Sequence, residues 1–218
     1  MIPILEWIFS ISTSIEWDNE LIEKYKVQYS NENILNGLQC KESYSGGSFD
    51  ILKAVLKYGI SNKNVAVLGS ELPWIEAILL NNNNKVTTID YNTENKKTDR
   101  IKIVNYFEVK KSKYDCFVCY SSVEHSGLGR YGEPLNENGD FEAMTFIYEN
   151  LKKNGLLFLA IPIGSDALVI NAHRIYGNIR YPVLIKDFKE LECSKNKEIL
   201  FNLPLSKTAI QPLIILQK

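Results

Sequence analysis

One stretch of the chain gathers residue types that can move a proton and bind an anion. It runs from Ser121 to Gly139, shows neither helical nor strand periodicity, and contains Glu124, His125 and Arg130. A histidine titrates near neutral pH and suits general acid–base chemistry, and Glu124 could either orient the imidazole or act as the base itself. Because long irregular loops in compact domains are usually functional, we expect Glu124 and His125 to be catalytic.

A second loop carries the other histidine of the chain. Residues 164–181 hold His173, Arg174 and Arg180, and they follow a second apolar run. In an open α/β sheet, ligands bind beyond the carboxyl ends of the strands, where both loops would lie. We therefore expect the two loops to meet, with His125 and His173 lining one cleft and His173 as a further catalytic candidate.

Side chains of these loops are also candidates for binding the substrate, because an arginine can hold a phosphate or carboxylate through two parallel hydrogen bonds. The candidates are Arg130, Tyr131, Arg174 and Arg180. In the other interpretation, the arginines pair with acidic residues and only brace the loops. Those acidic residues are Glu133, Asp140 and Glu142.

Apolar runs that alternate with amphipathic segments must position these loops. The runs predict parallel strands at 65–68, 86–89, 101–105, 115–120 and 156–161. Helical spacing predicts the helices between them, with Ser48 and Asp140 as N-caps of two of these helices. Two further runs, 198–202 and 213–216, follow one another without an intervening helix and predict an antiparallel pair.

The predicted fold is therefore α/β, a doubly wound, Rossmann-like domain with a mainly parallel sheet and an antiparallel C-terminal edge. This order matches the sheet of class I methyltransferases better than that of dehydrogenases. For a chain of 218 residues we expect one such domain over 44–218, preceded by a helical N-terminal appendage over 1–43.

The ends of the first two strands carry a candidate cofactor site. Gly69 and Ser70 form the turn into a helix whose free N–H groups favour a negative charge. Asp90 ends the second strand, where a carboxylate can accept hydrogen bonds from both hydroxyls of a ribose. Tyr91 and Ser121, at the ends of two strands, complete the cofactor-binding candidates. The alternatives are a plain tight turn at Gly69 and a plain turn carboxylate at Asp90.

The composition argues against a nucleic-acid or integral membrane partner. The formal net charge is −1, and lysines and arginines are scattered along the chain. The apolar segment 1–15 is interrupted by Glu6, is too short to span a bilayer, and lacks the basic start of a signal peptide. We expect a cytoplasmic protein that acts on a small-molecule substrate. The N-terminal segment would be a flap, a homo-oligomer contact or a peripheral membrane contact.

Neither the cysteines nor the histidines predict a metal site. Cys116 and Cys119 have C-x-x-C spacing but lie in a predicted strand, where residues three apart point to opposite faces. They fit reduced, buried thiols. A site made of Glu124, His125 and His173 would have no helical ligand spacing behind it.

Several segments resemble a domain-of-unknown-function family of methyltransferase-like proteins. The most specific is residues 122–135, SVEHSGLGRYGEPL, and the resemblance covers about residues 44–185. Other segments that fit are 67–76, 87–92, 151–164 and 171–177. The resemblance implies the fold of S-adenosylmethionine-dependent methyltransferases, in which Gly69 and Asp90 would hold the cofactor.

Two functions follow from the sequence. The first is methyl transfer from S-adenosylmethionine to a small polar acceptor, such as a sugar or a glycan precursor, with Glu124 or His125 taking the proton. The second is a methyltransferase-like binding or assembly protein with a degenerate cofactor pocket. In that protein Trp74 would fill the adenosine space, and the glycines usual after a first glycine such as Gly69 are missing.

Overall fold

The computed structural model describes residues 2–6, 15–37, 46–110, 113–170 and 172–218. The chain divides into two compact units, residues 13–118 and residues 1–12 with 119–218. We call them the 13–118 unit and the 119–218 unit. Strand β5 (Tyr114–Tyr120) begins in the first unit and ends in the second.

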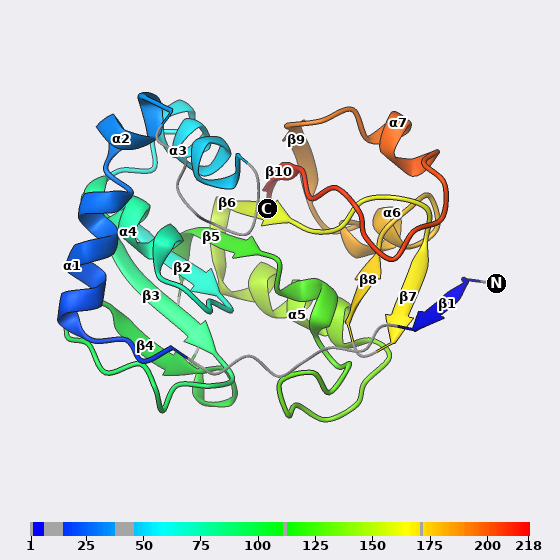
Figure 1. The fold of residues 1–218 in the computed structure, drawn as a ribbon, viewed down its shortest axis with the longest axis horizontal. Coiled ribbons are helices and arrows are strands. Elements are labelled where there is room, and N and C mark those ends of the chain that lie inside the picture. Colours follow the sequence, from blue (N-terminus) through cyan, green and yellow to red (C-terminus); the bar gives the residue numbers. More distant parts are fainter. Residues whose placement is uncertain (1, 7–14, 38–45, 111–112, 171) are drawn as a thin grey trace. The chain divides into compact units, whose positions relative to one another are not determined.

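Four parallel strands form the sheet of the 13–118 unit (Figure 1). Strand β2 (Asn64–Leu68) pairs with β3 (Lys85–Asp90) on one side and with β5 on the other, and β3 also pairs with β4 (Lys102–Asn105). Four of the five residues of β2 are buried. Strands of a parallel sheet are usually covered on both faces, which explains why β2 is an unbroken apolar run rather than an alternating one.

Helix α4 (Trp74–Asn81) leads from β2 to β3 and packs against both strands. Helices α1 (Asn19–Gln28) and α3 (Gly47–Lys57) pack on α4, and α2 (Asn31–Leu35) packs on α3. A 3₁₀ turn, η1 (Tyr106–Glu108), follows β4.

Most strand pairs of the 119–218 unit are antiparallel, and one pair in its small sheet is parallel. Strand β10 (Leu213–Gln217) lies between β6 (Leu151–Ala160) and β9 (Lys189–Cys193) and is antiparallel to both. A separate small sheet has the order β1 (Ile4–Glu6), β7 (Ala167–Ile170) and β8 (His173–Ile175). The helical elements are η2 (Val123–His125), α5 (Gly139–Asn150), α6 (Arg180–Leu184) and α7 (Lys197–Phe201).

The predicted α/β class, the mainly parallel sheet and the antiparallel C-terminal edge are confirmed. One strand of that edge was wrong, because residues 198–202 lie in helix α7 and its C-cap rather than in a strand. The side chain of Asn196 accepts a hydrogen bond from the backbone of Ile199 (3.3 Å) and so starts a helix there. The edge strand is instead β9.

The loop predicted over 164–181 contains a β-hairpin, β7 and β8, and the start of α6. The burial of β7 alternates, with Ala167 and Val169 buried, and this period-two pattern is the signal that the sequence prediction missed. Both predicted N-caps were also wrong, because Gly46 precedes α3 and Asn138 precedes α5.

The predicted N-terminal appendage includes helices α1 and α2, and its boundary at residue 43 stays a prediction. Most of the apolar segment 1–15, the predicted flap or oligomer contact, lies outside the described residues. In the described part of the chain, no helix is long and apolar enough to cross a membrane.

Candidate functional site

The candidate catalytic loop begins with a strained residue. Ser121 directly follows β5, has a φ of +52° and donates its backbone N–H to the carbonyl of Ala160 (2.9 Å). The left-handed region is unfavourable for a residue with a Cβ, and such strain concentrates at functional sites. The reversal of the chain leads directly into η2, which presents Glu124 and His125 in a buried turn.

Glu124 is fully buried, and its two carboxyl oxygens have different surroundings. Oε1 accepts hydrogen bonds from the Ser121 hydroxyl (2.7 Å) and from the Gln211 amide (3.3 Å). Gln211 also donates to the Ser121 hydroxyl (3.2 Å). Oε2 of Glu124 and Oε1 of Gln211 are buried and have no hydrogen-bond partner among the described residues. Buried polar atoms normally have a partner, so these two oxygens mark a place where a donor group could bind.

Burial raises the pKa of Glu124 to about 7, although the hydrogen bond from Ser121 and the charge of Arg130 oppose this. A carboxyl group with this pKa is present in both protonation states near neutral pH. It can therefore accept or give a proton there, as a general acid–base group must.

His125 is also buried, and burial together with Arg130 lowers its pKa to about 3. Its Nδ1 lies 2.5 Å from the carbonyl oxygen of Ala172, so Nδ1 must carry the proton, because a carbonyl only accepts. The other ring nitrogen, Nε2, lies 3.6 Å from Oε1 of Glu124. His125 is thus a neutral ring beside Glu124.

The two predicted loops do meet. The rings of His125 and His173 are nearly perpendicular, with centroids 6.2 Å apart. His173 is half-buried, its Nε2 lies 3.1 Å from the carbonyl of Lys207, and burial lowers its pKa. A pocket of about 590 Å³ is lined by residues of the 203–210 segment, by the 163–165 turn and by Ile175, and neither histidine lines it.

Arg130 and Tyr131 flank the histidine pair. A terminal nitrogen of Arg130 lies 3.4 Å from the carbonyl of Ala172, and its guanidinium stacks on the Tyr131 ring at 5.4 Å. Tyr131 in turn meets the His125 ring edge-on at 5.8 Å. Glu133, which could have paired with an arginine, accepts hydrogen bonds from the backbone of Gly129 and Tyr131.

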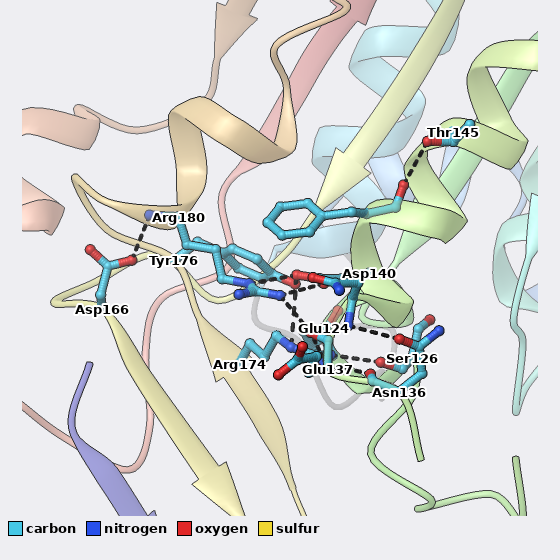
Figure 2. Close-up of polar contacts among 12 residues, drawn as sticks. Glu124, Ser126, Asn136, Glu137, Asp140, Thr145, Asp166, Arg174, Tyr176 and Arg180 are labelled. Carbon is cyan, nitrogen blue, oxygen red and sulfur yellow. Dashed lines mark hydrogen bonds and ion pairs between the residues drawn. The ribbon is translucent and has the colours of Figure 1, made fainter. Parts of the chain in front are cut away.

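Arg174 and Arg180 instead join a buried network around Asp140 (Figure 2). Arg180 binds both carboxylate oxygens of Asp140 at 2.8 and 2.6 Å, and the hydroxyl of Tyr176 donates to the same carboxylate at 3.0 Å. Arg174 is almost fully buried and donates to the carbonyl oxygen of Ser126 at 2.7 Å. Arg174 and Arg180 therefore have the contacts expected if they brace the two loops rather than bind a substrate.

The candidate cofactor residues in the 13–118 unit lie together. Gly69 has a φ of +67° and donates to the carbonyl of Ile89 (2.8 Å). The next backbone N–H, that of Ser70, donates to the Asp90 carboxylate (3.1 Å). The carboxylate is 15% exposed and receives a second backbone donor, Asn92, and the ammonium of Lys96. A tight glycine turn tied to a strand-end carboxylate fits the ribose end of a nucleoside-like cofactor.

A second buried glutamate supports this turn. Glu76, on α4, accepts hydrogen bonds from the hydroxyls of Ser70 (3.2 Å) and Thr88 (2.8 Å). Tyr91 packs against Tyr106 and Phe107, and the buried Trp74 lies 6.2 Å from the ring of Tyr29.

Cys116 and Cys119 are buried free thiols on β5, and burial raises the pKa of both. Among the described residues, no group of three or more His, Cys, Asp and Glu side chains is placed to hold a metal ion.

Three residues of these sites were missed from the sequence: Gln211, Lys96 and Glu76. Gln211 lies 87 residues from Glu124 and 90 from Ser121. Glu76 is only 6 and 12 residues from Ser70 and Thr88, but no local pattern marks it as their acceptor. Lys96 is near Asp90 in sequence, but its lysine pair with Lys97 suggested a solvated loop.

Comparison with known proteins agrees with the fold. Residues 62–213 match the model of a family described as Caenorhabditis protein of unknown function, DUF268. None of the curated proteins compared with the chain matches it.

Solved methyltransferase structures have a similar fold. The 1,6-didemethyltoxoflavin-N1-methyltransferase of Burkholderia thailandensis, crystallised with 1,6-didemethyltoxoflavin and S-adenosylhomocysteine, is 11% identical, with a TM-score of 0.60 over 97% of this chain and 93% of that chain. An S-adenosylmethionine-dependent methyltransferase from Clostridium acetobutylicum is 10% identical, with a TM-score of 0.55 over 89% and 98%. The N-methyltransferase NodS of Bradyrhizobium japonicum, crystallised with S-adenosylhomocysteine, is 10% identical, with a TM-score of 0.54 over 86% and 97%. Identities this low show the shared fold alone.

Proposed function

The chain belongs to the DUF268 family, and we propose that it transfers a methyl group from S-adenosylmethionine to a hydroxyl or amine of a small polar molecule, such as a sugar or a glycan precursor. The observation that carries this proposal is the turn at Gly69, hydrogen-bonded through Ser70 to Asp90 at the end of β3. Solved methyltransferases with this fold were crystallised with S-adenosylhomocysteine, which supports the choice of cofactor.

In this proposal Asp90 accepts hydrogen bonds from the ribose, and Gly69 allows the ligand close to the backbone. The bound cofactor supplies an electrophilic methyl group. The acceptor must lose a proton when its oxygen or nitrogen is methylated, and we assign that proton to Glu124. Its pKa near 7 suits the task, and its Oε2 is free of protein partners among the described residues.

We assign His125 a positioning role rather than the role of base. A ring whose pKa is about 3 is a weak base, and its Nδ1–H is committed to the carbonyl of Ala172. Its Nε2 lies 3.6 Å from Oε1 of Glu124, so the ring packs beside the carboxyl group and can hold it in place. Arg130 and Tyr131 flank this pair and stay the candidates for binding the acceptor.

Calorimetric titration with S-adenosylhomocysteine tests the cofactor part. Asp90→Ala should weaken binding by about 1–3 kcal/mol, the usual effect of losing hydrogen bonds to a charged group. The matched control is Asp99→Ala, which removes an exposed carboxylate from the same connection and should bind as the wild type does. Equal affinities in the wild type and Asp90→Ala would contradict the assignment of Asp90.

The acceptor part needs a transfer assay. Protein incubated with S-adenosylmethionine labelled in its methyl group should transfer label to a member of a panel of sugars, sugar nucleotides and amines. Transfer that requires Glu124 supports the proposal. If the protein binds the cofactor but transfers label to no compound of the panel, the proposed cofactor is supported and the proposed acceptor class is contradicted.

A second candidate is a non-catalytic binding protein, and one observation favours it. Lys96 forms an ion pair with Asp90 (3.2 Å), so the carboxylate that would hold the ribose already has a cationic partner. If neither the wild type nor a variant lacking this lysine binds S-adenosylhomocysteine, the result favours a non-catalytic binding protein over a methyltransferase.

A further inference from the structure

Three donors already converge on the carboxylate of Asp90. The backbone of Ser70 and the Lys96 ammonium donate to Oδ2, at 3.1 and 3.2 Å, and the backbone of Asn92 donates to Oδ1 at 3.1 Å. The two backbone donors are fixed by the turns on which they lie. The lysine is the one donor of the three that can leave by rotating a side chain.

The side chain of Lys96 is only 4% exposed, and other contacts hold it in place. Its ammonium also donates to the carbonyl of Asn92 (2.8 Å) and lies 5.1 Å from the centre of the Trp17 ring. A cation over an indole face is stabilised by the ring quadrupole. If Lys96 left Asp90, it would therefore keep a hydrogen bond and a cation–π contact.

Trp17 is itself anchored to this region. It is buried, its indole N–H donates to the carbonyl of Glu71 (3.1 Å), and its backbone exchanges hydrogen bonds of 2.7 Å with Asn95 and Lys97 on either side of Lys96. The lysine thus sits in a frame built from the N-terminal part of the unit. An exposed surface ion pair has no such set of supporting contacts, so the position of Lys96 is well defined.

An ionised carboxylate offers about four lone-pair sites, and three are taken. A ribose presents two hydroxyls and needs two acceptors if both are to bind. We infer that Lys96 competes with the ribose for Asp90 and thereby sets the affinity for the cofactor. This inference rests on the proposed function, and it makes Lys96 an affinity-determining residue rather than a ligand to the cofactor.

The test is calorimetric titration of the full chain with S-adenosylhomocysteine. Lys96→Met keeps the length of the side chain and its packing on Trp17 but removes the charge and the donors. It should bind about fivefold to twentyfold more tightly than the wild type, the range expected when a partly buried charge-assisted hydrogen bond no longer competes. The matched control, Lys97→Met, removes the exposed neighbouring charge and should leave the affinity unchanged.

A double-mutant cycle shows whether the gain acts through Asp90. In an Asp90→Asn background, Lys96→Met should change the affinity for S-adenosylhomocysteine little or not at all, because no carboxylate remains for the lysine and the ribose to compete for. Circular dichroism checks that each variant is folded. Lys96→Gln, which removes the charge but keeps an N–H donor, is the second variant if Lys96→Met does not fold, and it should also tighten binding.

Unchanged or weaker binding by folded Lys96→Met would overturn the inference, and weaker binding would mean that the lysine contacts the cofactor directly. Binding by Lys96→Met but not by the wild type would support it strongly. If no variant binds S-adenosylhomocysteine, the proposed cofactor is wrong and the inference falls with it. Failure of the inference alone is therefore distinguishable from failure of the proposed function.

Discussion

Two glutamates, one in each unit, share the same burial and differ in what their oxygens contact. Glu76 and Glu124 are both fully buried, and burial raises the pKa of each to about 7. Both oxygens of Glu76 have a hydroxyl within hydrogen-bond distance: Thr88 donates to Oε1, and Ser70, whose single proton is shared with the carbonyl of Leu72 (3.1 Å), lies 3.2 Å from Oε2. Glu124 collects its donors on Oε1, while Oε2 has no partner among the described residues.

This difference suggests a structural role for Glu76 and a chemical role for Glu124. Burial alone sets a pKa suited to proton transfer in both cases, so the pKa does not identify the functional residue. The carboxyl group of Glu76 links the turn at Ser70 to Thr88 on β3. One oxygen of Glu124 has no partner among the described residues, and for that reason we propose that Glu124, rather than Glu76, carries the chemistry.

The largest expected effect is on methyl transfer. Glu124→Gln removes the group that takes the proton, so turnover at saturating cofactor should fall by about 10²- to 10⁴-fold, the range typical of lost general acid–base catalysis. Glu76→Gln should change turnover at saturating cofactor by less than tenfold. The rate of labelled methyl transfer measures both.

Glu137→Gln is the control for a general effect of lost charge, because Glu137 is exposed in the same loop. Its turnover should equal that of the wild type. If Glu76→Gln lowered turnover as much as Glu124→Gln, the distinction drawn from the free oxygen would be wrong.

The next effect is on stability. Asp140 binds Arg180 through both oxygens and accepts the Tyr176 hydroxyl, and it is fully buried. Asp140→Ala leaves the arginines without their carboxylate, and breaking a buried pair in this way costs about 3–5 kcal/mol. Urea unfolding measures the change. Glu142→Ala, an exposed site on the same helix, should change the free energy of unfolding by about 0.5 kcal/mol or less.

A loss in Asp140→Ala no larger than in Glu142→Ala would show that the network in Figure 2 does not hold the two loops. Glu76 of the 13–118 unit instead lies against the neutral hydroxyls of Ser70 and Thr88 and forms no ion pair among the described residues. Loss of the Asp140 carboxylate should therefore lower the free energy of unfolding more than loss of the Glu76 carboxylate.

Most of the fold could be predicted because its signals are local. Unbroken apolar runs such as Val65 to Leu68 predict buried parallel strands, and the prediction of an α/β sheet is confirmed. The errors came where a short polar signal decided the structure. Asn196 starts a helix where the apolar residues Ile199 and Leu200 suggested a strand.

The candidate site was predictable only where its residues share a loop. Glu124 and His125 are adjacent in a stretch without periodicity, and the meeting of that loop with His173 followed from strand topology. Gln211 could not be found in this way, because it reaches Glu124 from 87 residues further along the chain. The role of Arg174 as a brace depended on carbonyl groups that carry no signal in sequence.

A smaller effect concerns the pH dependence of stability. A carboxyl whose pKa rises from 4.5 in the unfolded chain to about 7 in the folded state stabilises the fold below pH 4.5, and this contribution is lost as the pH rises through 7. Between pH 5 and pH 8 the wild type should therefore lose about 1–3 kcal/mol relative to Glu124→Gln. Glu76→Gln should show a difference of the same sign.

Comparing each variant with the wild type removes the opposite contribution of His125, whose lowered pKa stabilises the fold above pH 6.5. Urea unfolding at several pH values gives the curves. A constant difference between the wild type and Glu124→Gln across this range would mean that Glu124 does not titrate there.

The smallest expected effect tests the donor that distinguishes Glu124 most from Glu76. Gln211 donates an N–H to Oε1 of Glu124 at 3.3 Å, and a donor of this kind stabilises the ionised carboxylate. Gln211→Leu keeps most of the volume and removes the donor, so the pKa of Glu124 should rise. The acid limb of the rate–pH profile should then move upward by up to about one pH unit, which corresponds to about 1.4 kcal/mol. Gln28→Leu, a change at a site in the other unit, should leave the profile in place. A profile that keeps its midpoint in Gln211→Leu while turnover falls would mean that the glutamine contacts the acceptor and does not tune the base.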